Sequence, residues 1–468
     1  MIASIRNALL RSSLPMVAGL VLLQQPLHCD ASSQAIDAQP KILRTLSDII
    51  NAGLTHDAQH QTDKLELAAA QKERLIAGAE LLPALSVSIR DSIVKGSLEG
   101  TGLLGTPEQR DLDYRNRVNA ITGRQTLFSL DAFARSRLGQ LRSELAEIIF
   151  QRRSSELMSR ILLAGIEARH ALSEVEASRA YVDALSAQNS AAKARFLEGD
   201  GTRQEIADVE GRLALARLAQ LDSEEMLRAA MNQIQKSIGP FRFEATRLTA
   251  NGKWPAELDM PLSAWQADSS VNSHLLMAQR KRIEISETER EARRGARFPR
   301  IDAFAGYSHA RGESVSTAGQ TTKQATAGLA LTMPLYQGGR LSEVEAQSVL
   351  LAQREESELE NLRSQLATEI ARGHQRVSSI PERMNQLRSA QESAELGLKA
   401  AVAGHQAGTL PIWVVLDAER RLYLMRREVS KSIRESMIAL VNLYVASGRF
   451  DPSRITWMES FVAGNTRQ

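Results

Sequence analysis

The chain contains the stretch Ala403-Gly404-His405-Gln406-Ala407-Gly408, followed by Asp417-Ala418-Glu419-Arg420-Arg421-Leu422. A similar pair of segments occurs nearer the N-terminus. The earlier form is Ala194-Arg195-Phe196-Leu197-Glu198-Gly199, followed by Asp208-Val209-Glu210-Gly211-Arg212-Leu213, at a constant offset of 209 residues. Each form joins two long stretches with helical periodicity. The sequence therefore predicts a tandem duplication of a helical hairpin.

The composition favours elongated helical packing. Only 4% of the 468 residues are aromatic and 13 are proline, which is poor material for several compact cores. The 58 basic and 55 acidic residues nearly balance, giving a net charge of +3, and they alternate along the chain as on the solvated faces of long helices. This balance gives no indication of nucleic acid as a partner.

The N-terminus is typical of an export signal. Arg6 and Arg11 precede the apolar stretch 14–23, and small residues follow at Ala31. That stretch is too short for a membrane-spanning helix, which needs ~20 apolar residues, so residues 1–31 are predicted to be a signal peptide. The single cysteine, Cys29, stands where a lipoprotein would be acylated, but the residues before it do not fit that pattern, and lipidation stays open. With one cysteine the chain forms no intrachain disulfide.

Four segments alternate between apolar and small or polar residues, as strands do. They are 85–90, 114–128, 301–309 and 325–333. Each approaches the ~10 residues of a transmembrane strand; the alternative is a soluble sheet with one face on a core. The polar, Gly- and Ser-rich stretches 96–113 and 311–323 are predicted to be loops.

Long helices are predicted around both strand pairs, over residues 134–197 and 340–405. Their apolar residues recur three and four positions apart, as in coiled coils: Leu138, Leu141, Leu145 and Ile148, then Leu359, Leu362, Leu366 and Ile370. At 1.5 Å per residue each helix would measure roughly 90 to 100 Å. The predicted organisation is a first repeat at 41–240, a second at 262–448 and a C-terminal tail at 449–468.

Each half of the chain is predicted to contain two strands followed by long helices. The motifs at the boundaries of these elements resemble those of TolC-like outer-membrane channel proteins of Gram-negative bacteria. The resemblance covers essentially the whole mature length. It rests on Arg297-Phe298-Pro299-Arg300-Ile301 and its counterpart Leu82-Pro83-Ala84-Leu85, on Met333-Pro334-Leu335-Tyr336-Gln337-Gly338-Gly339-Arg340, echoed by Thr126-Leu127-Phe128, and on Gly408-Thr409 with Val415-Leu416-Asp417-Ala418-Glu419.

The resemblance implies a mainly α fold with a small β part. Four strands cannot close a membrane barrel, because the smallest closures use about eight. The family arrangement is a homotrimer whose twelve-stranded β-barrel continues into an α-helical barrel in the periplasm. It implies a passive exit duct in the outer membrane, working with a periplasmic adaptor and an inner-membrane ABC or proton-driven transporter. Type I protein secretion is favoured over drug or metal efflux, and a soluble periplasmic coiled-coil scaffold is the alternative from another class.

Two sets of residues are predicted at the tips of the helical hairpins. The turns contain Gly199, Gly201, Gly408 and Thr409, and the resemblance suggests a pore constriction near Asp417, Val414, Leu410, Glu205 and Asp208. Val414 and Leu410 stand where the family usually has an acidic and a basic residue, which favours a gate held by packing around Leu410, Ile412 and Val414 over a salt-bridge lock. The alternative for Asp417 is a carboxylate at a helix N-terminus, stabilised by the helix dipole.

Other motifs carry little functional weight. Gly338 and Gly339 fit a sharp turn from strand into helix. The G-x-G-x-x-G pattern at 100–105 lacks a surrounding βαβ unit. His56 and His60 are four residues apart, but a zinc site needs three or four protein ligands. No catalytic arrangement stands out, so we predict no enzyme activity, cofactor or metal site.

Overall fold

The structure is a computed structural model that describes residues 42–101, 107–199, 201–249, 252–314 and 317–461. The chain divides into a unit Met1–Lys41 and a unit Ile42–Gln468, and the second contains every element described below. The predicted signal peptide and Cys29 lie outside the described residues, as do residues 462–468 of the predicted tail.

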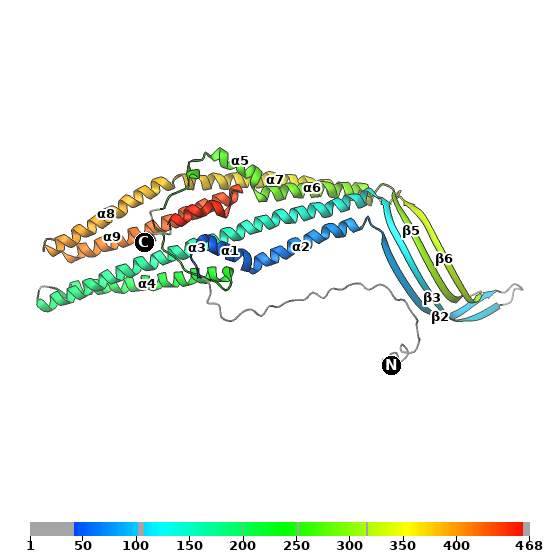
Figure 1. Cartoon of the computed structure of the whole chain (residues 1–468), viewed down its shortest axis with the longest axis horizontal. Coiled ribbons are helices and arrows are strands. Elements are labelled where there is room, and N and C mark those ends of the chain that lie inside the picture. The colour runs from blue at the N-terminus through cyan, green and yellow to red at the C-terminus, as the bar shows by residue number, and fades with distance from the viewer. Residues whose placement is uncertain (1–41, 102–106, 200, 250–251, 315–316, 462–468) are drawn as a thin grey trace, which may run out of the picture. The chain divides into compact units, whose positions relative to one another are not determined.

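Two hairpins form one antiparallel sheet. Its strands are β2 (Ala84–Thr101), β3 (Pro107–Phe128), β5 (Arg300–Ser314) and β6 (Thr317–Thr332), in the order β2-β3-β5-β6 (Figure 1). The central pair β3–β5 joins the halves of the chain, with Ile121 opposite Tyr307. The four predicted strands are confirmed.

The predicted loops 96–113 and 311–323 are wrong over most of their length. Strand pairing continues to Thr101 and resumes at Pro107 in the first hairpin, and it continues to Ser314 and resumes at Thr317 in the second. Backbone hydrogen bonds between the two strands of a hairpin do not require apolar side chains, so the polar ends of these strands stay paired.

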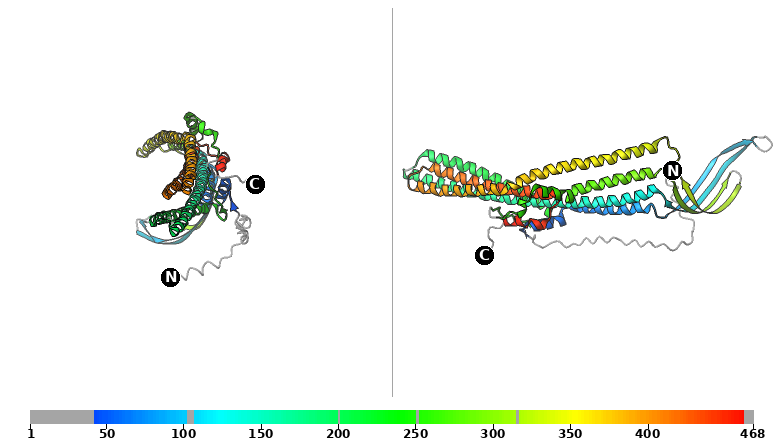
Figure 2. Two further views of the ribbon diagram at one scale, coloured as in Figure 1. Left: turned by 90° about the vertical axis from the view of Figure 1, so that its left-hand side faces the viewer. Right: turned by 90° about the horizontal axis from the view of Figure 1, so that it is seen from above.

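The helices form a curved layer (Figures 1 and 2). Next to the sheet, neighbours in the layer are α2 (Ala58–Ala79), α3 (Leu130–Glu198), α6 (His274–Gly295) and α7 (Arg340–Ser378). In the other half they are α4 (Arg203–Ile238), α3, α9 (Ile412–Ser447) and α8 (Ile380–Gln406). The 69-residue helix α3 runs through both halves and contacts α2, α4, α6 and α9.

The second long helix is broken. A single helix over 340–405 was the expectation, but α7 ends at Ser378 and α8 begins at Ile380, with Pro381 in its first turn. Proline has no backbone N–H, so it is tolerated in the first turn of a helix and removes a hydrogen bond inside one. The prediction of the first long helix, 134–197, is confirmed by α3.

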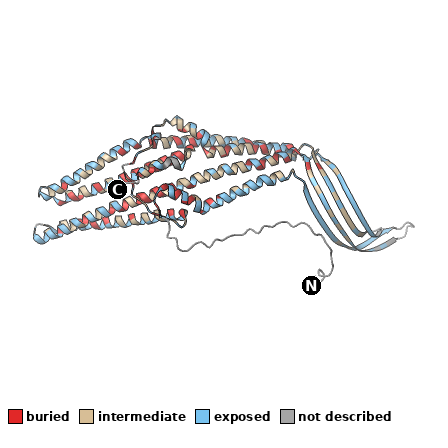
Figure 3. Ribbon diagram, in the orientation of Figure 1, coloured by how far each residue is buried: buried red, intermediate tan, exposed pale blue. Residues whose placement is uncertain are grey.

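The main core lies where the two halves of the layer meet. Short elements cover the helices there: β1 (Ile42–Leu43), α1 (Leu46–His56), β4 (Arg242–Phe243), η1 (Ala256–Asp259), α5 (Leu262–Asn272) and η2 (Pro452–Phe461). Helices α1 and α3 approach closely through glycines, because a Cβ at Gly165 would lie 2.7 Å from Ile49 Cδ1. Figure 3 shows buried residues gathered along the helices, while the sheet is largely exposed.

A buried arginine ties three parts of the chain together at this core. Arg169 of α3 is fully buried, and its Nη2 donates to the Arg44 carbonyl at 2.7 Å. Its Nη1 lies 3.5 Å from the carboxylate of Glu459 in η2, and that carboxylate also accepts from the backbone N–H of Leu46 at the start of α1. The predicted tail thus contributes to the core through Met458 and Phe461, with Trp457 packed against them.

Candidate functional site: helical tips and strand-to-helix junction

Both helical hairpins turn through a glycine with positive φ. Gly199 ends α3 with φ 92°, and Gly408 follows α8 with φ 74°, a region that side chains with a Cβ disfavour. In the first turn, Thr202 Oγ1 accepts from the backbone N–H of Glu205 at 3.2 Å and caps α4. In the second, the Gly404 carbonyl accepts from the N–H and the hydroxyl of Thr409, each at 2.9 Å. Gly201 lies in the first turn as well.

An apolar cluster joins the two hairpins behind these turns. We call it the tip cluster: Leu185, Val209, Leu213, Ala216, Ala401, Ile412, Val415 and Leu416. Val414 packs against its edge. Leu410 folds over the turn, because a Cβ at Gly404 would lie 2.6 Å from Leu410 Cδ1. Of the predicted apolar gate, Ile412 is therefore core, Val414 is at its rim and Leu410 covers the turn.

The predicted carboxylates have different surroundings. Asp417 is the sixth residue of α9 and accepts from Arg421 Nε at 2.9 Å, one turn along the same helix. It is thus not in the first turn, where the helix-dipole alternative placed it. Glu205 lies 3.9 Å from Arg195 across the first turn, and Asp208 is exposed on α4. Their role in a constriction stays a prediction.

Polar and aromatic side chains connect α3 to α9 along the inside of the layer, a feature that sequence reasoning missed. Tyr181 stacks on Tyr423 with ring centroids 4.7 Å apart, and Arg427 lies over the Tyr423 ring while pairing with Glu174. Two further α3–α9 contacts follow: His170 Nδ1 to Ser430 Oγ at 2.8 Å, and Arg434 Nη1 to Glu167 Oε1 at 3.0 Å. The four contacts recur every three or four residues on α9 and every three to seven residues on α3.

Burial shifts the acid–base behaviour of two groups between these helices. It lowers the pKa of His170 to about 4, with the positive charges of Arg434, Arg427 and Lys431 acting in the same direction. Burial also raises the pKa of Glu419 on α9, against a hydrogen bond from Gln188 that lowers it. Burial therefore shifts both side chains toward their neutral forms, relative to exposed His and Glu.

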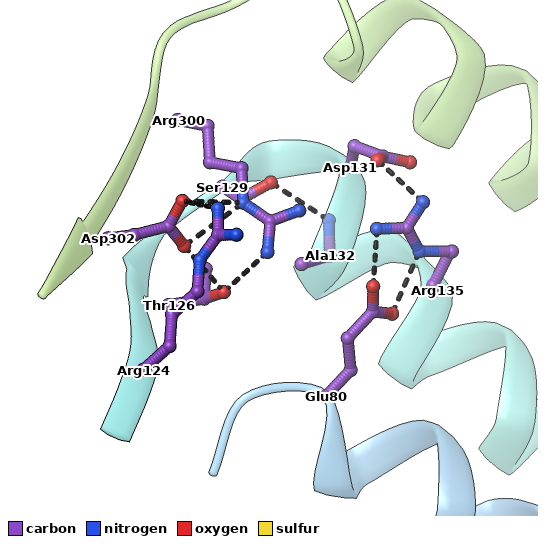
Figure 4. A network of polar contacts seen from close by, with 9 residues as sticks. All are labelled: Glu80, Arg124, Thr126, Ser129, Asp131, Ala132, Arg135, Arg300 and Asp302. Atoms are coloured by element: carbon purple, nitrogen blue, oxygen red, sulfur yellow. Dashed lines mark hydrogen bonds and ion pairs between the residues drawn. The ribbon is translucent and has the colours of Figure 1, made fainter. Parts of the chain in front are cut away.

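A second polar network holds the junction of strands and helices (Figure 4). Asp302 on β5 is buried and accepts from Arg124 Nη2 at 2.5 Å, Thr126 Oγ1 at 3.0 Å and Arg300 Nε at 3.1 Å. Beside it, Arg135 of α3 pairs with Glu80 at 2.6 Å and Asp131 at 2.7 Å. Asp302 directly follows the motif 297–301, and an acid two residues after Arg300 at the start of an apolar strand was the available signal.

The remaining predicted residues are placed as follows. Gly338 and Gly339, with φ 59° and 80°, lie between β6 and α7, and Gly339 is the N-cap of α7. His56 meets the Phe241 ring edge-on at 5.2 Å, and His60 stacks on Phe150 at 5.4 Å. Within the described ranges, no group of three or more His, Cys, Asp or Glu side chains is placed to hold a metal. Residues 102–105 of the G-x-G-x-x-G segment lie outside those ranges.

In the part of the chain that the structure describes, the helices are not apolar over a length sufficient to cross a membrane.

Comparison with known proteins agrees with this arrangement. The family model for outer membrane efflux proteins matches residues 267–449. The chain is 27% identical to the proteases secretion protein PrtF of Dickeya chrysanthemi over 410 residues, which is 86% of this chain and 88% of that protein. It is 24% identical to the alkaline protease secretion protein AprF of Pseudomonas aeruginosa over 424 residues, 90% of this chain and 88% of that protein.

The fold matches as well. The crystal structure of the Campylobacter jejuni outer membrane channel CmeC superposes with a TM-score of 0.74 at 12% identity, covering 92% of this chain and 94% of that one. Sheet, junction and paired helical hairpins thus have the same fold as this outer membrane channel. In sequence and fold the chain is similar to TolC-like channel proteins, and these similarities support a location in the outer membrane with the helical part in the periplasm. Its relatives are secretion and efflux channel proteins rather than enzymes.

Proposed function

We propose that three copies of this chain form the exit duct of a type I protein secretion system. The function as an outer-membrane exit duct follows from the family and the fold. The proposal adds the trimer, the type of cargo and the partners. The observation that carries it concerns the edges of the single chain. The sheet ends in unpaired strands, and the helical layer ends in exposed apolar side chains, so both could pack against another copy.

The sheet leaves two edges unpaired within one chain. Strand β2 pairs only with β3, and β6 pairs only with β5, in the described sheet. Open strand edges are not tolerated in lipid, because their backbone N–H and C=O groups would lack partners. Pairing of β6 in one copy with β2 in the next removes both edges, and three copies supply twelve strands.

The helical layer ends in exposed leucines on both sides. On the α2–α4 side these include Leu65, Leu75, Ile76, Leu215, Leu218 and Leu221, and on the α7–α8 side Leu350, Leu351 and Leu396. Most are more than half exposed in the single chain. Exposed apolar side chains in such numbers mark an interface, and the two sides face each other when copies are arranged head to tail around an axis.

The cargo and partners are inferred from the relatives. PrtF and AprF are both named for protease secretion, which supports protein cargo delivered by an inner-membrane ABC transporter through a periplasmic adaptor. The matching family model is described as an efflux protein model, and this favours a drug or metal efflux duct as the second candidate.

Assembly is tested by mass measurement of the protein extracted from outer membranes in mild detergent. A heat-labile species of three times the chain mass is expected. To place the interface, cysteines introduced at Leu75 and Leu350, on opposite sides of the layer, should cross-link one copy to another. A folded, membrane-inserted monomer would contradict the trimer.

Cargo is tested in a strain that lacks the chain. Loss of extracellular protease, with unchanged sensitivity to antibiotics and metals, is expected for a type I duct. Unchanged secretion together with increased drug or metal sensitivity would replace the proposal by the efflux alternative.

A further inference from the structure

The apolar face of the sheet ends in a cluster of basic side chains. Residues directly opposite each other in an antiparallel pair point to the same face, so each row of partners across the four strands can be read from the register. One such row contains Val87, Ile121, Tyr307 and Ala325. The next row toward the helices on this face, Leu85, Gly123, Ala305 and Ala327, is also apolar or small. The row after it contains Ala303 and Leu329 together with one polar residue, Gln125.

The character of this face changes over the next rows away from the helices. The row after Val87 contains Ile89, Asn119, His309 and Lys323, and the one after that contains Asp91, Arg117, Arg311 and Thr321. Arg115 follows, opposite Ile93. Because alternate residues of a strand are about 7 Å apart, the face passes from apolar to basic within the length of one or two side chains.

Positive charge is in excess in this cluster. Asp91 is shared by two of the arginines, accepting from Arg115 Nε at 2.8 Å and from Arg117 Nη2 at 2.9 Å. Arg311 and Lys323 form no ion pair with a described residue, and both are exposed. Among the side chains that the structure describes in these rows, four cations therefore accompany a single carboxylate. Farther out, Lys95 and Asp113 pair at 3.7 Å, and further acids on this face include Asp111 and Glu99.

The opposite face of the sheet shows that this enrichment is one-sided. The row of that face that lies between the two basic rows contains Arg90, Val118, Ala310 and Thr322. The row before it contains Ser88, Ala120, Ser308 and Gln324, with no charge. If these charges served only to keep the sheet soluble, they would not be expected to gather on the apolar face. The cations lie on the face that the proposed function exposes to lipid.

We propose that Arg115, Arg117, Arg311 and Lys323 bind the phosphate groups of anionic glycolipid headgroups in the outer leaflet of the outer membrane. The inference rests on the proposed function, which places the helices in the periplasm and hence the far end of the strands at the outer surface. The apolar rows match the acyl chains, and the basic rows then lie at headgroup depth. Guanidinium groups bind phosphate through paired hydrogen bonds, and basic clusters beside an apolar span attract anionic headgroups.

The test uses the whole protein purified in detergent, titrated with bisphosphorylated lipid A and followed by native mass spectrometry. The variant R311Q/K323Q is chosen because neither side chain forms an ion pair with a described residue. Its substitution should therefore leave the sheet intact. Its affinity for the lipid should fall on the order of 10-fold. The matched control R90Q, on the opposite face of the same sheet, should stay within about twofold of the unmodified protein.

Two further ligands identify the chemistry that is bound. Lipid A without its phosphates should bind at least about 10-fold more weakly than the bisphosphorylated form. Inorganic phosphate should not displace the lipid at millimolar concentration, because it lacks the acyl chains. Equal binding of both lipids, equal loss in R90Q and R311Q/K323Q, or displacement by free phosphate would each overturn the inference. Mass and channel conductance are recorded on the same samples: a trimeric, conducting protein without phosphate-dependent binding removes this inference alone, and a non-trimeric protein removes the proposed function.

Discussion

The two repeats differ most in the helix that leads from the sheet to the tip. In the first repeat α3 runs unbroken for 69 residues, whereas in the second the same path is divided into α7 and α8 at Ser379. The helices that return from the tip have not diverged in this way. Both α4 and α9 have 36 residues, and they begin and end at the same offset of 209.

The position of each helix in the layer explains the difference. Helix α3 lies in the middle and contacts neighbours on both sides along its length, including α2, α6, α4 and α9. The α7–α8 path lies at the edge of the layer within one chain. At the offset of the repeat, Pro381 corresponds to Leu172 inside α3. A central helix that must keep register with four neighbours has less freedom to bend than one at an edge.

Exchanging the residues at this position should produce the largest effect. Leu172→Pro removes a hydrogen bond inside α3 and places the proline ring against the preceding turn, so it should lower the free energy of unfolding by about 3 kcal/mol or more. Pro381→Ala should change it by less than about 1 kcal/mol, because Pro381 already lies in a first turn. Denaturant unfolding at fixed protein concentration measures both. Equal losses of unfolding free energy in the two variants would show that the helix break at Ser379 does not distinguish the repeats.

Charges placed in the shared core should affect the two repeats alike. Leu157 and Leu366 correspond at the offset of 209, and both are buried in the main core. Leu157→Asp and Leu366→Asp should each cost about 2 kcal/mol or more, because the carboxylate is buried without a partner. Half-buried Leu362→Asp should cost less, and exposed Gln365→Asp serves as the control. If Leu366→Asp leaves the unfolding midpoint unchanged, the equivalence of the repeats fails.

The seam between α3 and α9 should respond to mild acid. His170 has a folded pKa of about 4, below the unfolded value of about 6.5, so the unfolded chain binds more protons between these values and stability falls as pH drops through that window. From pH 7 to pH 5 the loss from this residue should be about 1 to 2 kcal/mol. His170→Gln should flatten this part of the pH profile. The residue at the same offset in the second repeat is Ser379, which cannot contribute. Parallel profiles in the two proteins would exclude His170 as the source.

The tips should show the smallest effect on stability and a distinct effect on conduction. Three copies of Asp417 around one axis attract cations, so Asp417→Asn should reduce cation selectivity and block by multivalent cations without affecting assembly. Asp208→Asn, the corresponding change in the first repeat, is the comparison.

Leu410→Ser should raise leakage of large antibiotics more than Asp417→Asn does, because Leu410 covers the second turn. The corresponding residue of the first turn is Gly201, which has no side chain to do so. Single-channel recordings in planar bilayers decide: unchanged selectivity would remove Asp417 from the pore, and a tight Leu410→Ser channel would remove the apolar gate.

Regular elements were predictable where a period was present. The strands around Leu85 and Leu329 and the helix α3 follow from spacings of two and of three to four. Strand ends were missed at 96–113 and 311–323, because pairing there depends on the backbone of a neighbouring strand and not on side-chain pattern. The break at Ser379 was missed because heptad spacing continues on both sides of a single proline.

The candidate site was predictable in part for the same reason. The glycine turns at Gly199 and Gly408 have a local signature, since positive φ favours glycine. The networks around Asp302 and between Tyr181 and Tyr423 join residues more than 170 positions apart, and nothing local in the sequence indicates which of the many charged and aromatic side chains will meet.

The contact between Arg169 and Glu459 has a consequence for the biogenesis of the chain. The first N–H of α1 and the buried guanidinium of α3 both depend on a carboxylate supplied about 290 to 413 residues later. Until that carboxylate arrives, closing the core around Arg169 would bury an uncompensated charge, which is strongly unfavourable. A nascent or truncated chain that ends before residue 459 should therefore close the core around α1 and α3 less readily, so that packing of the first helices is coupled to completion of the chain.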